Sequence, residues 1–132
     1  MKNILEEIAA RTRERIAKEK SRISVSELEN RIQEVNKNAR QKITFLQALQ
    51  KDGMSYICEV KKASPSKGLI APDFPYLAIA KEYEQAGASA ISCLTEPFYF
   101  QGADQYLREI AAAVQIPVLR KDFTVDEYMI YQ

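Results

Sequence analysis

The sequence predicts an α/β protein in which parallel strands alternate with helices behind a helical N-terminal segment. Two observations lead to this fold class. First, the hydrophobic period is helical over residues 1–53 and changes at residue 54. Second, short apolar runs begin near residues 56, 90 and 117, and amphipathic helical stretches separate them. This order is typical of parallel βα units joined by right-handed crossovers.

Residues 1–53 are expected to form a helical N-terminal extension. An apolar stripe at helical spacing marks the first helix; it comprises Ile4, Leu5, Ile8, Ala9 and Ile16. Ser26 stands three residues before Glu29, which is the spacing of a capping box, so a second helix is expected to begin there. A short third helical segment covers residues 45–49 and stops before Gly53.

Residues 54–132 are expected to supply three βα units. The predicted strands cover residues 56–61, 90–95 and 117–121. The predicted helices between them cover residues 75–87 and 104–114. Pro75 suits the first position of a helix because it has no N–H to leave unpaired. Thr124 precedes Glu127 by three residues, which predicts the capping box of a further helix.

Composition excludes several classes of function. The chain of 132 residues has no histidine, which excludes a Ser-His-Asp triad, a His-bearing zinc site and a haem-ligating His within it. The net charge of +1 does not indicate a nucleic-acid partner, and no apolar run is long enough for a membrane span. Two cysteines, Cys58 and Cys93, are too few for a disulfide scaffold and indicate a reducing compartment, so a cytoplasmic protein is expected.

The charge is unevenly distributed along the chain. Residues 1–50 carry a net charge of +4 and the remainder carries −3. Because acids are interleaved with the bases, a solvated helix face is favoured over a basic arm that binds nucleic acid. The last predicted helix has run only about two turns at Gln132, and a sheet of three parallel strands has two unpaired edges. The chain is therefore expected to be the front of a longer protein and, by itself, to associate with further copies.

Charged residues stand at the ends of two predicted strands. Glu59 and Lys61 are two residues apart and so point to the same side of their strand, and Lys121 ends the third strand. Ligands and catalytic side chains gather at the C-terminal ends of parallel strands. Two lysines and a glutamate at one such edge could exchange protons. The alternative is a structural ion pair with two lysines that reach into solvent.

Two loops could contribute to the same site. Residues 63–68 lack the order of a phosphate-binding P-loop, and they are either a mobile lid able to meet an anion or an ordinary surface loop. Residues 98–100 are successive aromatics that could stack on a ring or cover the helix layer. Cys58 and Cys93 are interpreted as small buried apolar residues.

Three stretches together resemble the indole-3-glycerol phosphate synthase family. They are EVKKASPSKG at residues 59–68, LTEPFYFQG at 94–102 and PVLRKDF at 117–123. The resemblance implies a (β/α)₈ barrel, of which residues 1–53 would be the helical extension and residues 54–132 the first three βα units. It also implies closure of an indole ring, with loss of CO₂ and water, from 1-(2-carboxyphenylamino)-1-deoxyribulose 5-phosphate, without a cofactor or a metal.

The resemblance also implies roles for individual residues. Lys121 matches the family's general acid, Lys61 its second catalytic lysine, and Glu59 the glutamate that positions both lysines. Ser64 matches a serine that lines the substrate pocket, and Phe100 an aromatic that packs on the anthranilate ring. The family takes its other acid–base residues and its phosphate-binding loops from later strands, so the 132 residues alone are expected to be inactive. The alternatives are another phosphate-binding barrel enzyme, and a non-catalytic fragment or helical interaction module.

Overall fold

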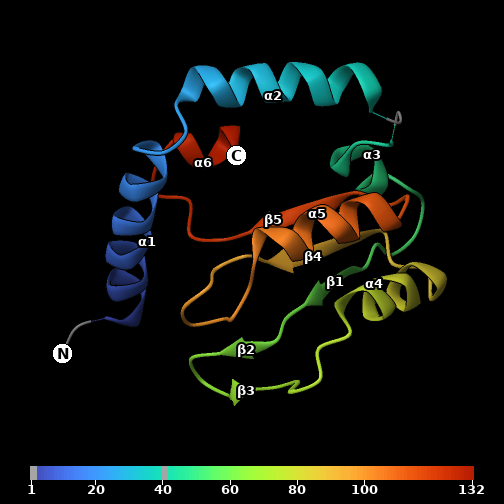
Figure 1. Cartoon of the computed structure of the whole chain (residues 1–132). Coiled ribbons are helices and arrows are strands. Elements are labelled where there is room, and N and C mark those ends of the chain that lie inside the picture. Colours follow the sequence, from blue (N-terminus) through green and yellow to red (C-terminus); the bar gives the residue numbers. More distant parts are fainter. Residues whose placement is uncertain (1–2, 40–41) are drawn as a thin grey trace. The chain divides into compact units, whose positions relative to one another are not determined.

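A computed structural model describes residues 3–39 and 42–132 (Figure 1). The contacts divide the chain into two compact units. One unit holds residues 1–41 together with 123–132, and the other holds residues 42–122. The second unit contains every residue that the sequence analysis assigns to the site.

The first unit is helical. It contains α1 (Ile4–Lys20), α2 (Val25–Asn38) and the short α6 (Tyr128–Tyr131). Asn3 caps α1 by accepting a hydrogen bond from the Leu5 N–H at 3.1 Å. Acidic residues occupy the first turn of α1 and basic residues its last turn, which suits the helix dipole.

A small apolar cluster holds the first unit together. It consists of Ile16, Leu28, Tyr128 and Met129. The Tyr128 hydroxyl donates to the Ile23 carbonyl oxygen at 2.8 Å, and Lys20 forms an ion pair with Asp126 at 2.7 Å. The predicted stripe on α1 is buried at Ile8 and Ile16, whereas its first residues are exposed.

Two predicted helix starts are wrong. The cap of α2 is Ser24, whose side chain accepts from the Glu27 N–H at 3.2 Å, and not Ser26. Ile23 before this cap and Leu28 within the first turn of α2 belong to the same apolar cluster, which is the arrangement of a hydrophobic staple and selects the earlier serine.

The helix expected from Thr124 also begins later, because α6 starts at Tyr128. The side chain that accepts a hydrogen bond at this turn is that of Asp126, which takes the Tyr128 N–H at 2.9 Å. Asp126 therefore shapes the start of α6, and the predicted capping box at Thr124 and Glu127 is absent from it.

The second unit is built on parallel strands. After α3 (Phe45–Leu49), the chain forms β1 (Ile57–Val60), α4 (Tyr76–Gln85), β4 (Ala90–Leu94), α5 (Asp104–Ala113) and β5 (Val118–Lys121). The strands pair in the order β1-β4-β5, and both pairings are parallel (Figure 1). The strand–helix alternation predicted from the sequence is present, with strand ends within a residue of those expected.

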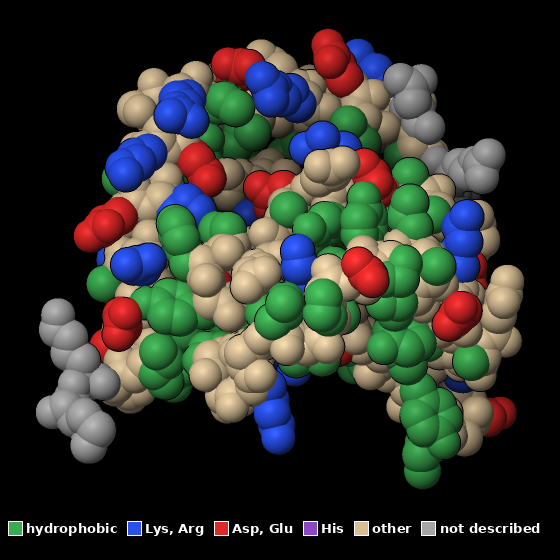
Figure 2. All heavy atoms as spheres, turned by 60° about the horizontal axis from the view of Figure 1, so that its bottom comes forward, with side chains coloured by type: hydrophobic (Ala, Val, Ile, Leu, Met, Phe, Trp, Pro, Cys, Tyr) green, Lys and Arg blue, Asp and Glu red, His purple; other side chains and the backbone are tan. Residues whose placement is uncertain are grey.

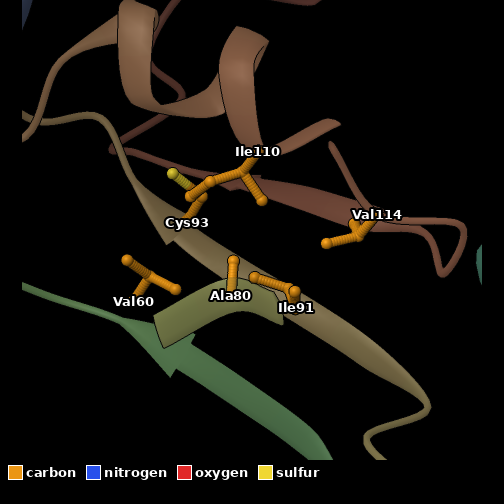
Figure 3. Packing of buried hydrophobic residues seen from close by; sticks show 6 residues of the cluster. All are labelled: Val60, Ala80, Ile91, Cys93, Ile110 and Val114. Carbon is orange, nitrogen blue, oxygen red and sulfur yellow. The ribbon is translucent and has the colours of Figure 1, made fainter. Parts of the chain in front are cut away.

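One face of this sheet packs against α4 and α5. Figure 3 shows Val60 of β1 and Cys93 of β4 facing Ala80 of α4 and Ile110 of α5. These side chains are all but fully buried. Every residue of β4 is buried, as its continuous apolar run predicts for a central parallel strand.

The other face of the sheet carries the charged residues. The register places Ile57, Glu59, Ser92, Leu119 and Lys121 on this face, because side chains alternate along a strand and paired residues share a side. Ile57 is 49% exposed and Leu119 is 44% exposed. Figure 2 shows one view of the whole molecule, in which hydrophobic side chains stand at the surface among scattered Lys, Arg, Asp and Glu side chains.

Residues 62–74, which include the loop expected at residues 63–68, contain a small hairpin. β2 (Ala63–Ser64) pairs antiparallel with β3 (Gly68–Leu69). The N–H groups of Ile70 and Ala71 both donate to the Lys62 carbonyl oxygen, at 2.8 and 3.2 Å. The segment directly after β1 therefore has backbone pairing of its own.

Cys93 is expected to resist thiol reagents in the folded chain. Burial, with a smaller contribution from the charge of Asp104, raises the pKa of its thiol to about 12. At pH 8 roughly one molecule in ten thousand would then carry the reactive thiolate. Alkylation followed by peptide mass spectrometry should find Cys93 unmodified until the chain is denatured. Rapid labelling of Cys93 under native conditions would contradict the packing shown in Figure 3.

Candidate active site

The structure brings Glu59, Lys61 and Lys121 together around one carboxylate. Lys61 Nζ lies 3.1 Å from Glu59 Oε1, and Lys121 Nζ lies 3.4 Å from Glu59 Oε2. The Ser92 hydroxyl donates to Glu59 Oε2 at 3.2 Å. Each carboxylate oxygen of Glu59 therefore has one lysine, and the central strand adds a hydroxyl bond to Oε2.

Strand register explains this convergence. Glu59 pairs with Ser92, and Lys121 pairs with Leu94, so the three strands end at the same edge of the sheet. Glu59 and Lys61 share a side by their spacing of two residues. The sequence predicts that geometry, whereas it does not single out Ser92, because the partner of Glu59 on β4 depends on the register.

The electrostatics of the site follow from two cations on one anion. The side chains of Glu59, Lys61 and Lys121 are 28%, 35% and 51% exposed. Burial alone would raise the pKa of Glu59, but the hydrogen bond from Lys61, the charge of Lys121 and the Ser92 hydroxyl together hold it below its ordinary value. Glu59 is thus an anion at neutral pH, and the three side chains form a net cationic group suited to an anionic ligand.

The carboxyl end of β5 is anchored next to Lys121. The Thr95 N–H donates to the Lys121 carbonyl oxygen at 2.9 Å, and the Thr95 hydroxyl donates to Asp122 Oδ2 at 2.8 Å. The Asp122 side chain is 2% exposed and lies 3.9 Å from the Arg120 guanidinium. These contacts hold the backbone of Lys121 in place, while its side chain extends to Glu59.

Ser64 and Phe100 lie in the segments that follow β1 and β4. Ser64, on β2, is buried; its hydroxyl accepts from the Lys67 N–H at 3.2 Å and lies 3.4 Å from the Ser66 hydroxyl. Phe100 is half-buried in the turn after β4. Both therefore stand on segments that leave the carboxyl ends of the strands, which is the edge that carries Glu59.

Glu96 is a buried polar residue that sequence reasoning did not assign to the site. It lies two residues after the end of β4 and is 1% exposed. Its carboxylate accepts from the N–H groups of Phe98, Tyr99 and Phe100, at 3.0, 2.7 and 3.0 Å. An acidic residue just after a buried strand of apolar and small residues is the signal that could have found it.

Gly102 closes the same turn. Its N–H donates to the Glu96 carbonyl oxygen at 2.8 Å. A Cβ at this position would lie 2.4 Å from the Leu94 carbonyl oxygen and 2.8 Å from the Thr95 carbonyl carbon, and both are backbone atoms of the central strand region.

Gly102→Ala is therefore expected to destabilise the chain by about 1–3 kcal/mol, as overpacking does elsewhere. Urea denaturation followed by circular dichroism measures the difference. Gly53→Ala serves as a control, since a Cβ there meets nothing within 4 Å. The φ of Gly53 is positive and that of Gly102 is not, so the control measures backbone strain without a close contact. A Gly102→Ala chain as stable as the wild type would contradict the close approach.

Among residues 3–39 and 42–132, no group of three or more His, Cys, Asp or Glu is placed to hold a metal ion. Within the same residues, no helix is both long enough and apolar enough to span a membrane.

The fold and the site together define a class of protein. Parallel βα units with paired acidic and basic side chains at the carboxyl ends of the strands are the arrangement of α/β enzymes that bind ligands at that edge. Residues 5–132 match the model of the family described as indole-3-glycerol phosphate synthase, and the chain belongs to this family. The family is one of (β/α)₈ barrels, as the motifs predict, and the parallel units seen here are consistent with part of such a barrel.

Curated relatives carry the same description. The chain is 52% identical over 129 residues to the indole-3-glycerol phosphate synthase of Lacticaseibacillus paracasei, a match that covers 98% of this chain and 49% of the relative. It is 51% identical over 130 residues to that of Ruminiclostridium cellulolyticum, with the same coverage, and 45% identical over 138 residues to that of Lachnoclostridium phytofermentans. The chain spans about half the length of the curated relatives it matches.

Proposed function

We propose that this chain supplies the lysine–glutamate part of an indole-3-glycerol phosphate synthase site. The observation that supports this most strongly is the Glu59 carboxylate shared between Lys61 and Lys121 at one edge of the sheet. The substrate would be the phosphorylated 1-(2-carboxyphenylamino)-1-deoxyribulose 5-phosphate, and the products indole-3-glycerol phosphate, CO₂ and water. One proton from solvent balances the carboxylate that is lost as CO₂.

Lys121 is the proposed general acid of ring closure. The aryl carbon that bears the carboxylate attacks the ketone carbon, and the electron pair of the C=O bond moves onto its oxygen. That oxygen takes a proton from the Lys121 ammonium group. Lys121 suits this step because its backbone is anchored by Thr95 while half of its side chain stays exposed and able to reach a ligand.

Lys61 is proposed to act on the later steps. The bond between the ring and the carboxylate breaks, its electron pair returns to the ring, and CO₂ leaves. The hydroxyl group formed from the ketone then departs as water with a proton from Lys61, and the adjacent carbon gives a proton to a base from another part of the completed site. Glu59 holds both ammonium groups in place through its two carboxylate oxygens.

Ser64 and Phe100 are proposed substrate contacts. Phe100 would pack on the anthranilate ring, and the buried Ser64 would line the pocket on the side of β1. Each step of the reaction moves only protons and electron pairs between carbon and oxygen, so the proposed chemistry needs no cofactor and no metal ion. The net cationic group around Glu59 attracts the substrate's carboxylate and phosphate.

The isolated chain is proposed to be inactive and to associate with further copies. Its matched relatives are about twice as long, so a site that needs residues from their other halves is incomplete here. The sheet face that carries Glu59 also exposes Ile57 and Leu119. A second copy is the simplest surface against which they could be buried.

A hybrid enzyme tests the proposed activity. It joins residues 1–132 to the half of the Lacticaseibacillus paracasei relative that the match does not cover. Indole-3-glycerol phosphate is measured by its fluorescence, with the intact relative as the positive control. We expect product formation at an enzyme-like rate. A hybrid that unfolds cooperatively but makes no product, both as one chain and as two mixed halves, would contradict the proposal.

A further inference from the structure

We propose that Glu96 is a positioning residue: its carboxylate holds the aromatic loop, residues 97–101, in the conformation that binds the aryl ring of the substrate. The inference rests on the proposed function and assigns a role to a residue outside the lysine–glutamate group. The structural support for the proposal is three hydrogen bonds, which run from three successive N–H groups of the loop to one carboxylate.

Glu96 is buried, and its hydrogen bonds to the loop replace the water that it would otherwise bind. A carboxyl group with 1% exposure is costly to bury unless hydrogen bonds replace its water shell. Oε1 accepts from the Phe98 N–H, and Oε2 accepts from those of Tyr99 and Phe100. Three bonds to one side chain fix the positions of three successive N–H groups, so they define one conformation of the backbone.

Two further features restrict the backbone conformation of the aromatic loop. The Gly102 N–H donates back to the Glu96 carbonyl oxygen, and Gln101 has a φ of 51°, which few residues other than glycine adopt. The bonds from 98–100 and the bond from Gly102 thus close the loop on Glu96 from both ends. The Cα–Cβ directions of Phe98 and Phe100 are set before any ligand arrives, which lowers the entropy lost on binding.

The position of the loop relates it to the reacting groups. It follows β4, the strand between β1 and β5, and those neighbours carry Glu59 with Lys61 and Lys121 respectively. Phe98 is 51% exposed at this edge, and Phe100 is half-buried. A flat ring stacked on the aromatic loop would therefore lie next to the strands that carry both lysines.

Glu96→Gln tests the role, and Glu84→Gln is its matched control. Glu84 Oε1 also accepts two backbone hydrogen bonds, from Gln115 at 2.6 Å and Ile116 at 3.1 Å, but these precede β5 at the opposite end of the strands. In Glu96→Gln, an amide NH₂ replaces one acceptor oxygen and faces N–H donors. Both variants replace a carboxylate that accepts backbone N–H groups with an amide. The remaining oxygen can keep both bonds in Glu84→Gln, whereas Glu96→Gln loses one of its two acceptor oxygens and so alters the aromatic loop.

The first readout does not depend on activity. The chain has five phenylalanines and can be labelled with 4-fluorophenylalanine, and its ¹⁹F signals can be assigned by single Phe→Leu substitutions. We expect Glu96→Gln to move the signals of Phe98 and Phe100 toward the free amino acid, with little change at Phe45. Unchanged Phe98 and Phe100 signals, or equal changes in Glu84→Gln, would overturn the positioning role.

The second readout separates binding from chemistry. In the hybrid enzyme, Glu96→Gln should raise KM about tenfold or more while kcat changes by less than about threefold, because the ring is held less well and Lys121 is untouched. An unchanged KM with moved ¹⁹F signals would overturn the link to ring binding. If the wild-type hybrid makes no product, the proposed function fails and the ring-binding claim fails with it, whereas the ¹⁹F result still decides whether Glu96 orders the loop.

Discussion

Replacing Lys121 with alanine in the hybrid enzyme is expected to lower kcat by about a hundredfold to ten-thousandfold, with a much smaller change in KM. A group that donates a proton to a developing alkoxide acts in the transition state, and general acids contribute about two to four decades in rate. Lys81→Ala is the control, since Lys81 is exposed on α4. Steady-state kinetics measured by product fluorescence give both constants.

Lys121→Arg separates proton donation from charge. Arginine keeps the positive charge beside Glu59 but does not release its proton at neutral pH. We therefore expect Lys121→Arg to remain at least about a hundredfold below the wild type. Recovery of kcat in Lys121→Arg, or an unchanged kcat with a raised KM in Lys121→Ala, would show that Lys121 is an electrostatic clamp and not the acid.

The 132-residue chain by itself is expected to form no detectable product and to increase in mass with concentration. The chemical reason is positioning, because poor alignment of reacting groups can cost several decades in rate. The physical reason is the apolar area that Ile57 and Leu119 leave exposed on the sheet. Burial of such area contributes about 25 cal/mol per Å², which favours association through that face.

A matched pair of substitutions locates the association surface. Ile57→Lys places a charge on the sheet face, whereas Ile130→Lys changes the same residue type at a 77% exposed position on α6. Light scattering across a concentration series should show association weakened at least about tenfold in Ile57→Lys and little changed in Ile130→Lys. A concentration-independent monomer, or a chain that turns over substrate alone, would contradict the expectation.

The hydrophobic pattern of the sequence predicts the strands and their alternation with helices along the chain. The apolar run of β4 could only be buried on both faces, and the alternation around Glu59 and Lys61 assigns both side chains to one side. Convergence with Lys121 then follows because parallel strands end at one edge. This part of the site was predictable because it depends on spacing alone.

Features that depend on tertiary contacts were harder to predict. Two serines, Ser24 and Ser26, both have the spacing of a capping box, and only the packing of Ile23 against Leu28 selects the first. The hairpin after β1 depends on a few local hydrogen bonds and has no apolar period to mark it.

The hydrogen-bond partners of Glu59 and Glu96 could not be predicted from the hydrophobic pattern either. Ser92 meets Glu59 only because the register pairs these two positions. Glu96 could have been an exposed residue at a strand end, and its role becomes visible only when the N–H groups of residues 98–100 turn back toward it.

The most direct test of the Glu59 site is a carboxyl ¹³C NMR titration of Glu59 in the hybrid enzyme, assigned by its loss in Glu59→Gln. We expect its pKa below the ordinary value of 4.5, and a higher pKa in both Lys61→Met and Lys121→Met, because each removes a cation from the carboxylate. Since folding lowers this pKa, Glu59 contributes stability that is fully present above about pH 4.5 and lost as the pH falls through its folded value. A Glu59 that titrates at or above 4.5 and responds to neither lysine would contradict the shared carboxylate on which the proposed acid–base chemistry depends.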